Sequence, residues 1–395
     1  MDYALTDEQQ ATQEAIRRFV QAEYPYAQRG DAVDAATFEQ RWTALAQMGL
    51  LGMAIDSRWG GSQQGPVELA LLARELGRGH AGEGCLPSMV LAGSLLQWLG
   101  TEAQCEQWLA PMVAGQRKLA LAYSEATSRY ALAHVQTRAQ PTPDGYRLNG
   151  QKSLVLGGAQ ADALLVLART DGKHQDMQGL SLFVVPARTA GLRIQPFQTL
   201  DGRQAAHLVL EDVQVDESAR LGALGQAYEA LHKAVDLGLL WTCAEALGAM
   251  ETLVQATTEH VKTRRQFGAP LARFQALQHR LADVMIGLEQ TEAMVFAAAM
   301  MMQEAPADLL RRVLATTKVL TGRAAQAASE TAIQLHGAMG MTAECRVGHF
   351  AKLLTTLTLL FGDPHHHTRW YADHALPGTG SDDVQNKVTH AKELA

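Results

Sequence analysis

Two motifs near the ends of helical stretches carry residue types suited to binding a phosphate-bearing cofactor. One occupies residues 264–268 (Arg-Arg-Gln-Phe-Gly), and the other occupies residues 334–340 (Gln-Leu-His-Gly-Ala-Met-Gly). A guanidinium group matches two phosphate oxygens at once, and glycine lets the backbone approach a ligand closely. Taken singly, these residues also fit a solvated arginine and a glycine that ends a helix. Their joint occurrence favours the cofactor.

Three segments of different hydrophobic periodicity must position these motifs. Residues 1–117 have the pattern of amphipathic helices, whereas residues 118–225 have the short, turn-bounded pattern of strands. Residues 226–375 return to long helical patterns, and residues 376–395 form a polar, glycine-rich tail. The sequence therefore predicts an α+β multidomain protein with an N-terminal helical domain, a middle β domain and a C-terminal four-helix bundle.

Glycines and turn residues predict individual elements within this outline. Gly49, Gly77 and Gly100 stand where helices are expected to end. Strands are expected at residues 118–123, 135–139, 146–156, 163–169, 180–185 and 207–215.

The composition excludes several classes of protein. Of the 395 residues, 47% are hydrophobic and 19% are charged, with a formal net charge of −7. This balance argues against disorder and against a nucleic-acid surface, which needs clustered lysine and arginine. No signal peptide or apolar run of membrane-spanning length is evident, so a soluble cytoplasmic protein without membrane contact is expected. The cysteines lack disulfide or metal-site spacing, which favours reduced buried thiols.

The order of the motifs resembles the acyl-CoA dehydrogenase family over essentially the whole chain. Besides the two motifs above, Leu-Asn-Gly-Gln-Lys at 148–152 resembles the family's hairpin, and Gly-Leu-Ser-Leu-Phe-Val-Val-Pro at 179–186 resembles its next strand pair. Residues within 124–130 and 359–367 further resemble the small subunits of pimeloyl-CoA-type and bacterial steroid-degrading dehydrogenases. The resemblance implies the family's fold and FAD as cofactor.

The reaction of this family sets three chemical requirements. Desaturation of an acyl thioester needs a base at the α-carbon, a hydride acceptor at the β-carbon and donors to the thioester carbonyl. No side chain accepts a hydride, so the acceptor is a flavin. The resemblance assigns Arg264, Phe267 and Gln334 to the pyrophosphate and adenosine of FAD, and it assigns Gly337 and Gly340 to close backbone approach. In this family these contacts are made in trans, to a flavin whose ring lies in a neighbouring subunit.

The ring side of the flavin site and the catalytic base depart from the family's pattern. The family's Thr-Glu-Pro motif is Ser-Glu-Ala here, with Ser124 keeping the hydroxyl, and its Trp-Ile-Thr motif is Leu-Val-Leu at 154–156. Phe361 stands at the usual position of the catalytic glutamate, and a phenyl ring cannot accept a proton. The family's second base position falls at Gly238, and the arginine usually beside it is Leu239.

Three other carboxylates lie near these positions in the sequence. Asp363 is the candidate nearest to Phe361, but Gly-Asp-Pro at 362–364 fits a helix N-cap followed by proline, and this interpretation is favoured. Glu245 lies seven residues after Gly238, about 10 Å along a helix, and would suit only a displaced substrate. Asp236 is expected to face elsewhere on that helix. None of the three is assigned as the base.

A run of histidines at 365–367, with His374, resembles a metal-binding sequence only superficially. Adjacent residues on a helix point about 100° apart, so three consecutive histidines cannot converge on one ion. A solvated or interface cluster is expected, and no metal site is predicted.

The sequence therefore predicts a subunit of an FAD-dependent acyl-CoA dehydrogenase that lacks the catalytic base and pairs with a catalytic paralogue, as an α2β2 heterotetramer. The resemblance implies an acyl-CoA substrate in the complex, electron-transfer flavoprotein as a partner, and a leaning toward dicarboxylic or steroid-derived thioesters. Two alternatives stay open: a self-sufficient dehydrogenase with a relocated base such as Asp363, and a non-enzymatic scaffold that binds neither flavin nor thioester.

Overall fold

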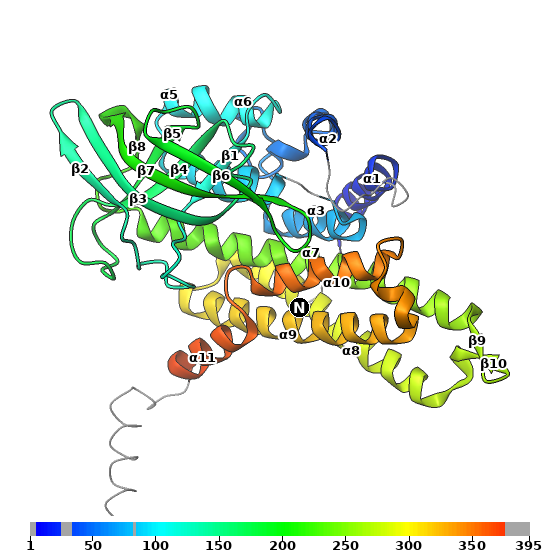
Figure 1. Ribbon diagram of the computed structural model, residues 1–395. Helices are drawn as coiled ribbons and strands as arrows, with labels where there is room; N and C mark the ends of the chain where they lie inside the picture. Colours follow the sequence, from blue (N-terminus) through cyan, green and yellow to red (C-terminus); the bar gives the residue numbers. More distant parts are fainter. Residues whose placement is uncertain (1–4, 25–33, 82–83, 376–395) are drawn as a thin grey trace, which may run out of the picture.

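The computed structural model describes residues 5–24, 34–81 and 84–375, which form a helical region, a β-sheet and a helical bundle in sequence order (Figure 1). This arrangement confirms the predicted fold class. The helices before the sheet are α1 (Asp7–Glu23), α2 (Ala35–Gln47), η2 (Leu50–Gly52), η3 (Ser57–Trp59), α3 (Pro66–Gly79), η4 (Cys85–Gly93), α4 (Ser94–Leu99), α5 (Glu102–Gln104), η5 (Cys105–Leu109) and α6 (Ala110–Val113).

The middle region is a sheet in the order β6-β7-β3-β2-β4-β5-β8, with β1 paired to β4 in parallel. Its strands are β1 (Leu119–Ala122), β2 (Arg138–Thr142), β3 (Gly145–Leu156), β4 (Ala163–Arg169), β5 (Leu180–Pro186), β6 (Leu192–Gln198), β7 (Gln204–Asp216) and β8 (Arg220–Leu221). All six predicted strands occur, with β2 shifted toward the C-terminus. The sequence missed β6, an edge strand that pairs with β7 and contains Pro196, because such a strand lacks a continuous apolar pattern.

The C-terminal region is built around α7, a helix of 36 residues that runs the length of the bundle (Figure 1). Its elements are α7 (Tyr228–Thr263), β9 (Arg265–Gln266), β10 (Ala269–Pro270), η7 (Leu271–Arg273), α8 (Gln275–Glu304), α9 (Ala307–His336), η8 (Gly337–Met341), α10 (Arg346–Leu359) and α11 (Pro364–Ala375). By length and composition, α7 and α8 could each cross a membrane. However, the most apolar window of α7 is 83% buried within the fold, whereas that of α8 is 33% buried. Helix α7 is therefore the core of the bundle, and α8 leaves an apolar face exposed.

The N-terminal helices pack closely on α7. Gly77 lies inside α3 and not at its end, so the helix end predicted there was wrong. A Cβ at Gly77 would lie 2.0 Å from the carbonyl oxygen of Glu245 on α7, and a Cβ at Gly248 would lie 1.8 Å from the carbonyl oxygen of Arg74. These two glycines let the backbones of α3 and α7 approach each other.

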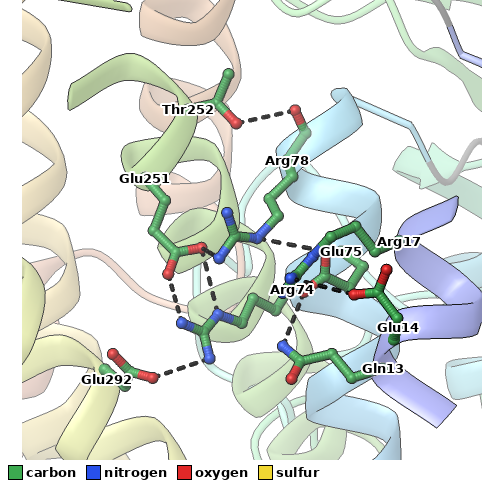
Figure 2. A network of polar contacts seen from close by, with 9 residues as sticks. All are labelled: Gln13, Glu14, Arg17, Arg74, Glu75, Arg78, Glu251, Thr252 and Glu292. Carbon is green, nitrogen blue, oxygen red and sulfur yellow. Dashed lines mark hydrogen bonds and ion pairs between the residues drawn. The ribbon is translucent and has the colours of Figure 1, made fainter. Parts of the chain in front are cut away.

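An ion-pair network also joins α3 to the bundle (Figure 2). Its members are Gln13, Glu14 and Arg17 of α1, Arg74, Glu75 and Arg78 of α3, Glu251 and Thr252 of α7, and Glu292 of α8. Arg74 pairs with Glu251 and, at 2.9 Å, with Glu292. Because both acids belong to the bundle, the arginine fixes the N-terminal region against α7 and α8.

Candidate functional site

The fold brings the two cofactor motifs together at one end of the bundle. The imidazole of His260, one turn before Arg264, stacks on that of His336, two residues after Gln334, with ring centroids 4.2 Å apart. Arg264 and Gln334 are exposed at this end. The ends of α7 and α9 therefore form one surface that carries both motifs.

The backbone at this surface depends on residues with positive φ. Gly337 ends α9 with φ 63° and ψ −147°, a conformation essentially restricted to glycine. Phe267, at the turn of the β9–β10 hairpin, has φ 53° and is 89% exposed. Its ring makes an edge contact with Phe274, with ring centroids 6.1 Å apart. A large aromatic residue displayed in this way is available to contact another molecule.

The predicted ring-side residues lie far from these motifs in the same chain. Figure 1 shows the β9–β10 hairpin at one end of the bundle and α11 toward the other. Gly238, near the start of α7, precedes Thr263 by 25 residues, which corresponds to about 38 Å of helix. A single chain therefore cannot place Arg264 and Phe361 around one flavin.

On the ring side, the motif that begins at Ser124 is organised around a buried ion pair. The Ser124 carbonyl accepts a hydrogen bond from the Ser153 backbone at 2.9 Å. The neighbouring Glu125 carboxylate accepts from Lys152 Nζ at 2.7 Å and from the hydroxyl of Thr137 at 2.7 Å. Burial raises the pKa of Glu125, but Lys152 and Thr137 outweigh burial and hold the pKa below its ordinary value. Burial lowers the pKa of Lys152 to about 8 despite the adjacent carboxylate. The pair ties the segment after β1 to β3.

The residues that replace the family's Trp-Ile-Thr motif present an apolar surface. Leu154 lies in β3 at an irregularity of the β3–β7 register, with φ 52°, and is 41% exposed. Leu156 is partly buried against the main core. Neither side chain has a polar atom, so these two positions cannot donate a side-chain hydrogen bond to a flavin ring.

Phe361 and Gly238, the two positions that the resemblance assigns to a base, face each other, and neither side chain can accept a proton. Phe361 is 9% exposed and has φ 59°. A Cβ at Gly238 would lie 2.9 Å from Cζ of Phe361 and 2.9 Å from a methyl carbon of Leu91. The phenyl ring of Phe361 therefore packs directly over Gly238, where no side chain intervenes.

A cavity of about 230 Å³ opens beside Phe361. Its lining residues are Tyr123, Arg129, Tyr130, Ala131, Leu132, Tyr228, His232, Val235, Asp236, Leu239, Arg311, Leu314, Ala315, Phe361, His366, His367 and Trp370. Asp236 was expected to face elsewhere, and that expectation was wrong. Its carboxylate lies 3.1 Å from Nδ1 of His232, one turn earlier on the same helix. This histidine was missed at the sequence level because an i, i+4 pair on a helix does not by itself indicate a site.

Asp363 has the geometry of a helix cap. Its Oδ1 accepts a hydrogen bond from the backbone N–H of His366 at 2.8 Å, and Pro364 begins α11. This is the hydrogen bond that the N-cap interpretation requires.

The histidine run was expected to be a solvated or interface cluster; His365 and His374 are exposed, but His367 is not solvated. His367 is buried, and its Nε2 donates to the carbonyl oxygen of Phe361 at 3.0 Å. Burial lowers the pKa of His367 to about 4, so the ring is neutral at pH 7. Over the parts of the chain that the structure describes, no three His, Cys, Asp or Glu side chains are placed to hold a metal ion.

Glu245, the other carboxylate considered as a base, is buried and paired. Arg203, in the loop before β7, binds both of its oxygens and also lies 3.2 Å from Asp201. Burial raises the pKa of Glu245, and Arg203 opposes that rise. The pair connects the sheet to α7, which accounts for a carboxylate at this position.

Comparison with known proteins agrees with this architecture. The family profiles of the acyl-CoA dehydrogenase N-terminal, middle and C-terminal domains match residues 6–116, 120–213 and 228–375. A probable acyl-CoA dehydrogenase from Bacillus subtilis, YngJ, is 29% identical over 351 residues, which cover 87% of this chain and 91% of that protein. The chain belongs to the acyl-CoA dehydrogenase family.

Two solved structures place it within the family. Butyryl-CoA dehydrogenase from Megasphaera elsdenii is 25% identical, with a TM-score of 0.85 over 93% of this chain and 98% of that chain. The ChsE4–ChsE5 complex from Mycobacterium tuberculosis is 28% identical, with a TM-score of 0.83 over 94% of this chain and 98% of that chain.

FAD is the cofactor of this family, and the two halves of its expected site differ in how well they fit. The end of the bundle carries the exposed Arg264 and, at Gly337, a backbone conformation that only glycine readily adopts, and both features suit a diphosphate. The residues predicted for the ring side of the same chain, Leu154, Leu156 and Phe361, have no polar side-chain atom that could hydrogen-bond to a flavin ring. The sequence did not single out His260 or His336 as site residues, because only the contact between the two rings in the folded chain distinguishes them from other histidines.

Proposed function

We propose that this chain is the subunit of an FAD-dependent acyl-CoA dehydrogenase that lacks the catalytic base and works with a catalytic paralogue. The observation that carries the proposal is the packing of Phe361 on Gly238. Removal of an α-proton needs a base within hydrogen-bonding reach, and both family positions for that base are occupied by groups that cannot accept a proton.

The separation of the two half-sites supports a second chain. The diphosphate surface and the ring side lie at opposite ends of α7, so a complete flavin site must combine two subunits. Helix α8 exposes Met285 and Ile286, which are 52% and 56% exposed, on a face suited to contact with a paralogue. The ChsE4–ChsE5 complex, named as a complex of two proteins, is a precedent for pairing within this fold.

In this assembly, an α2β2 heterotetramer, the chain contributes binding and not chemistry. Arg264 holds the diphosphate as a fixed cation, while Phe267 and Gln334 contact the adenosine and pyrophosphate. Bound FAD supplies the hydride acceptor for desaturation of an acyl-CoA thioester, of a dicarboxylic or steroid-derived acid, and electron-transfer flavoprotein reoxidises the complex in the cytoplasm. Phe361 fills the position of the base in this chain and keeps water from it.

The test is co-expression with the product of a neighbouring paralogous gene, followed by a flavin count for each chain. We expect the isolated chain to be colourless and inactive on acyl-CoA, and the complex to be yellow and active. Arg264→Ala in this chain should weaken flavin binding by about 1.5–3 kcal/mol, since it removes a charged contact to the diphosphate. Arg265→Ala is the matched control. Stoichiometric flavin in the pure homomer, or flavin content indifferent to Arg264, would contradict the proposal.

A self-sufficient dehydrogenase remains the second candidate, because Asp236 lines the same cavity as Phe361. It requires activity in the isolated chain that Asp236→Asn or Asp363→Asn abolishes. A pure scaffold, in contrast, predicts that no substitution at the end of the bundle changes the flavin content of the complex.

A further inference from the structure

The stacked imidazoles of His260 and His336 lie at the diphosphate surface, where nothing described so far requires them. His260 stands in the last turn of α7, four residues before Arg264, and His336 stands in the last turn of α9, between Gln334 and Gly337. Their rings are inclined by only 23° at a centroid separation of 4.2 Å. Both rings are half-buried, so each keeps one side near solvent.

In each ring, one nitrogen already makes a hydrogen bond to a backbone group. Nδ1 of His336 lies 2.9 Å from the carbonyl oxygen of Ala332, and because a carbonyl only accepts, Nδ1 carries the proton. The Leu335 backbone raises the pKa of His260 through a hydrogen bond, which identifies that ring as a donor as well. The remaining nitrogen of each ring is therefore a bare acceptor in the neutral state. It becomes a donor only when the ring gains a second proton.

The surroundings of His260 disfavour its protonation in the absence of an anion. Burial, the neighbouring His336 and the cation of Arg264 all lower the pKa of His260. Within the described chain, the residues that act on this ring electrostatically are His336 of α9 and Arg264 at the end of α7, and neither is an acid. The carboxyl ends of α7 and α9 carry partial negative charge, which favours a cation in their last turns. A bound diphosphate dianion would add its negative charge to that of the helix ends, and would then raise the pKa of the pair above the value in the free protein.

We propose that His260 and His336, with Arg264, form a proton-linked binding site for the diphosphate of a dinucleotide. The pair takes up one proton from solvent as the ligand binds, and the imidazolium so formed donates from its second nitrogen to a phosphate oxygen. Stacking at 4.2 Å disfavours a second positive charge, so one proton is taken up and not two. The inference rests on the proposed trans diphosphate contact and adds the groups that make it depend on pH.

The experiment uses the full chain alone and ADP-ribose as the probe. ADP-ribose carries adenosine and a diphosphate diester that does not titrate near neutral pH, so any pH dependence of its binding comes from the protein. Histidine ring signals are followed by NMR against pH, with and without ADP-ribose. We expect the pKa of one of the two histidines to rise by about 1–3 pH units with the ligand. His207, which stacks on Phe197 in the sheet, should not change.

Binding of ADP-ribose should weaken by about tenfold for each pH unit between the pKa of the free pair and that of the complex, and should level off above the latter, as expected for one linked proton. His260→Gln combined with His336→Gln should bind ADP-ribose with little pH dependence. If the pKa values of His260 and His336 in the wild-type chain are the same with and without ADP-ribose, the inference is overturned without any variant.

The outcomes separate this inference from the proposed function. If ADP-ribose leaves the histidines unchanged while Arg264→Ala still lowers the flavin content of the complex, the proton-linked pair is refuted and the trans contact stands. If ADP-ribose shifts the pair but flavin content of the complex does not depend on Arg264, the diphosphate site stands and the assigned subunit role is refuted.

Discussion

Gly238→Ala tests whether the ring of Phe361 closes the space where a base would act. The added Cβ would lie 2.9 Å from the Phe361 ring and from Leu91, so one neighbour must move. Overpacking of this kind lowers the free energy of unfolding by about 1–3 kcal/mol, while the exchange of glycine for alanine inside a helix raises it by about 1 kcal/mol. In the wild-type background, the substitution should therefore lower the free energy of unfolding or leave it nearly unchanged.

In a Phe361→Ala background the balance should reverse. The ring contact is absent, the end of the Leu91 side chain can rotate, and the helix-propensity gain remains. Gly238→Ala should then stabilise by up to about 1 kcal/mol, giving a coupling of about 1–3 kcal/mol between the two positions.

Calorimetric unfolding of the four proteins in this cycle measures the coupling. About 1 kcal/mol corresponds to roughly 2–4 °C for a unit of 150–250 residues, so the difference is resolvable. Gly287→Ala on α8 is the matched control, because its Cβ would meet Ala324 at 3.3 Å and no part of Phe361. An equal effect of Gly238→Ala in both backgrounds would refute the packing argument. Should Phe361→Ala fail to fold, Phe361→Leu serves as the second background.

Three further predictions concern buried and capping charges. Asp363→Asn should leave turnover of the complex and stability nearly unchanged, and Asp363→Ala should cost about 1 kcal/mol in unfolding free energy; a large rate loss in the Asn variant would identify a base and not a cap. Arg203→Met should cost about 3–5 kcal/mol in denaturant unfolding, because it leaves the buried carboxylates of Glu245 and Asp201 without their cation, and adding Glu245→Leu should recover part of the loss. Lys318 donates to the carbonyl of Leu357 at 2.6 Å, and burial lowers its pKa to about 8 from 10.5. The unfolded chain thus holds this proton more tightly, stability rises from pH 8 toward 10.5, and Lys318→Met should flatten part of that rise; an unchanged slope contradicts the assignment.

The sequence alone determined the features that depend on short-range chemistry. The change of period near residue 118 and its return near residue 226 predict strands between two helical regions, because side-chain alternation follows backbone geometry directly. The loss of a proton acceptor at Phe361 is likewise a matter of residue type, and so is the cap at Asp363.

Tertiary structure decided the features that depend on approach between distant segments. Gly77 has the local signature of a helix end, yet it lies within α3, where glycine is required because the backbone of α7 comes too close for any side chain. Asp236 faces the cavity with Phe361 because the orientation of α7 is set by what packs around it, and its own periodicity does not fix that orientation. The contact of His260 with His336 joins residues 76 positions apart. Only the packed helix ends bring these imidazoles together, since helical periodicity fixes which residues share a face but not which face meets another helix.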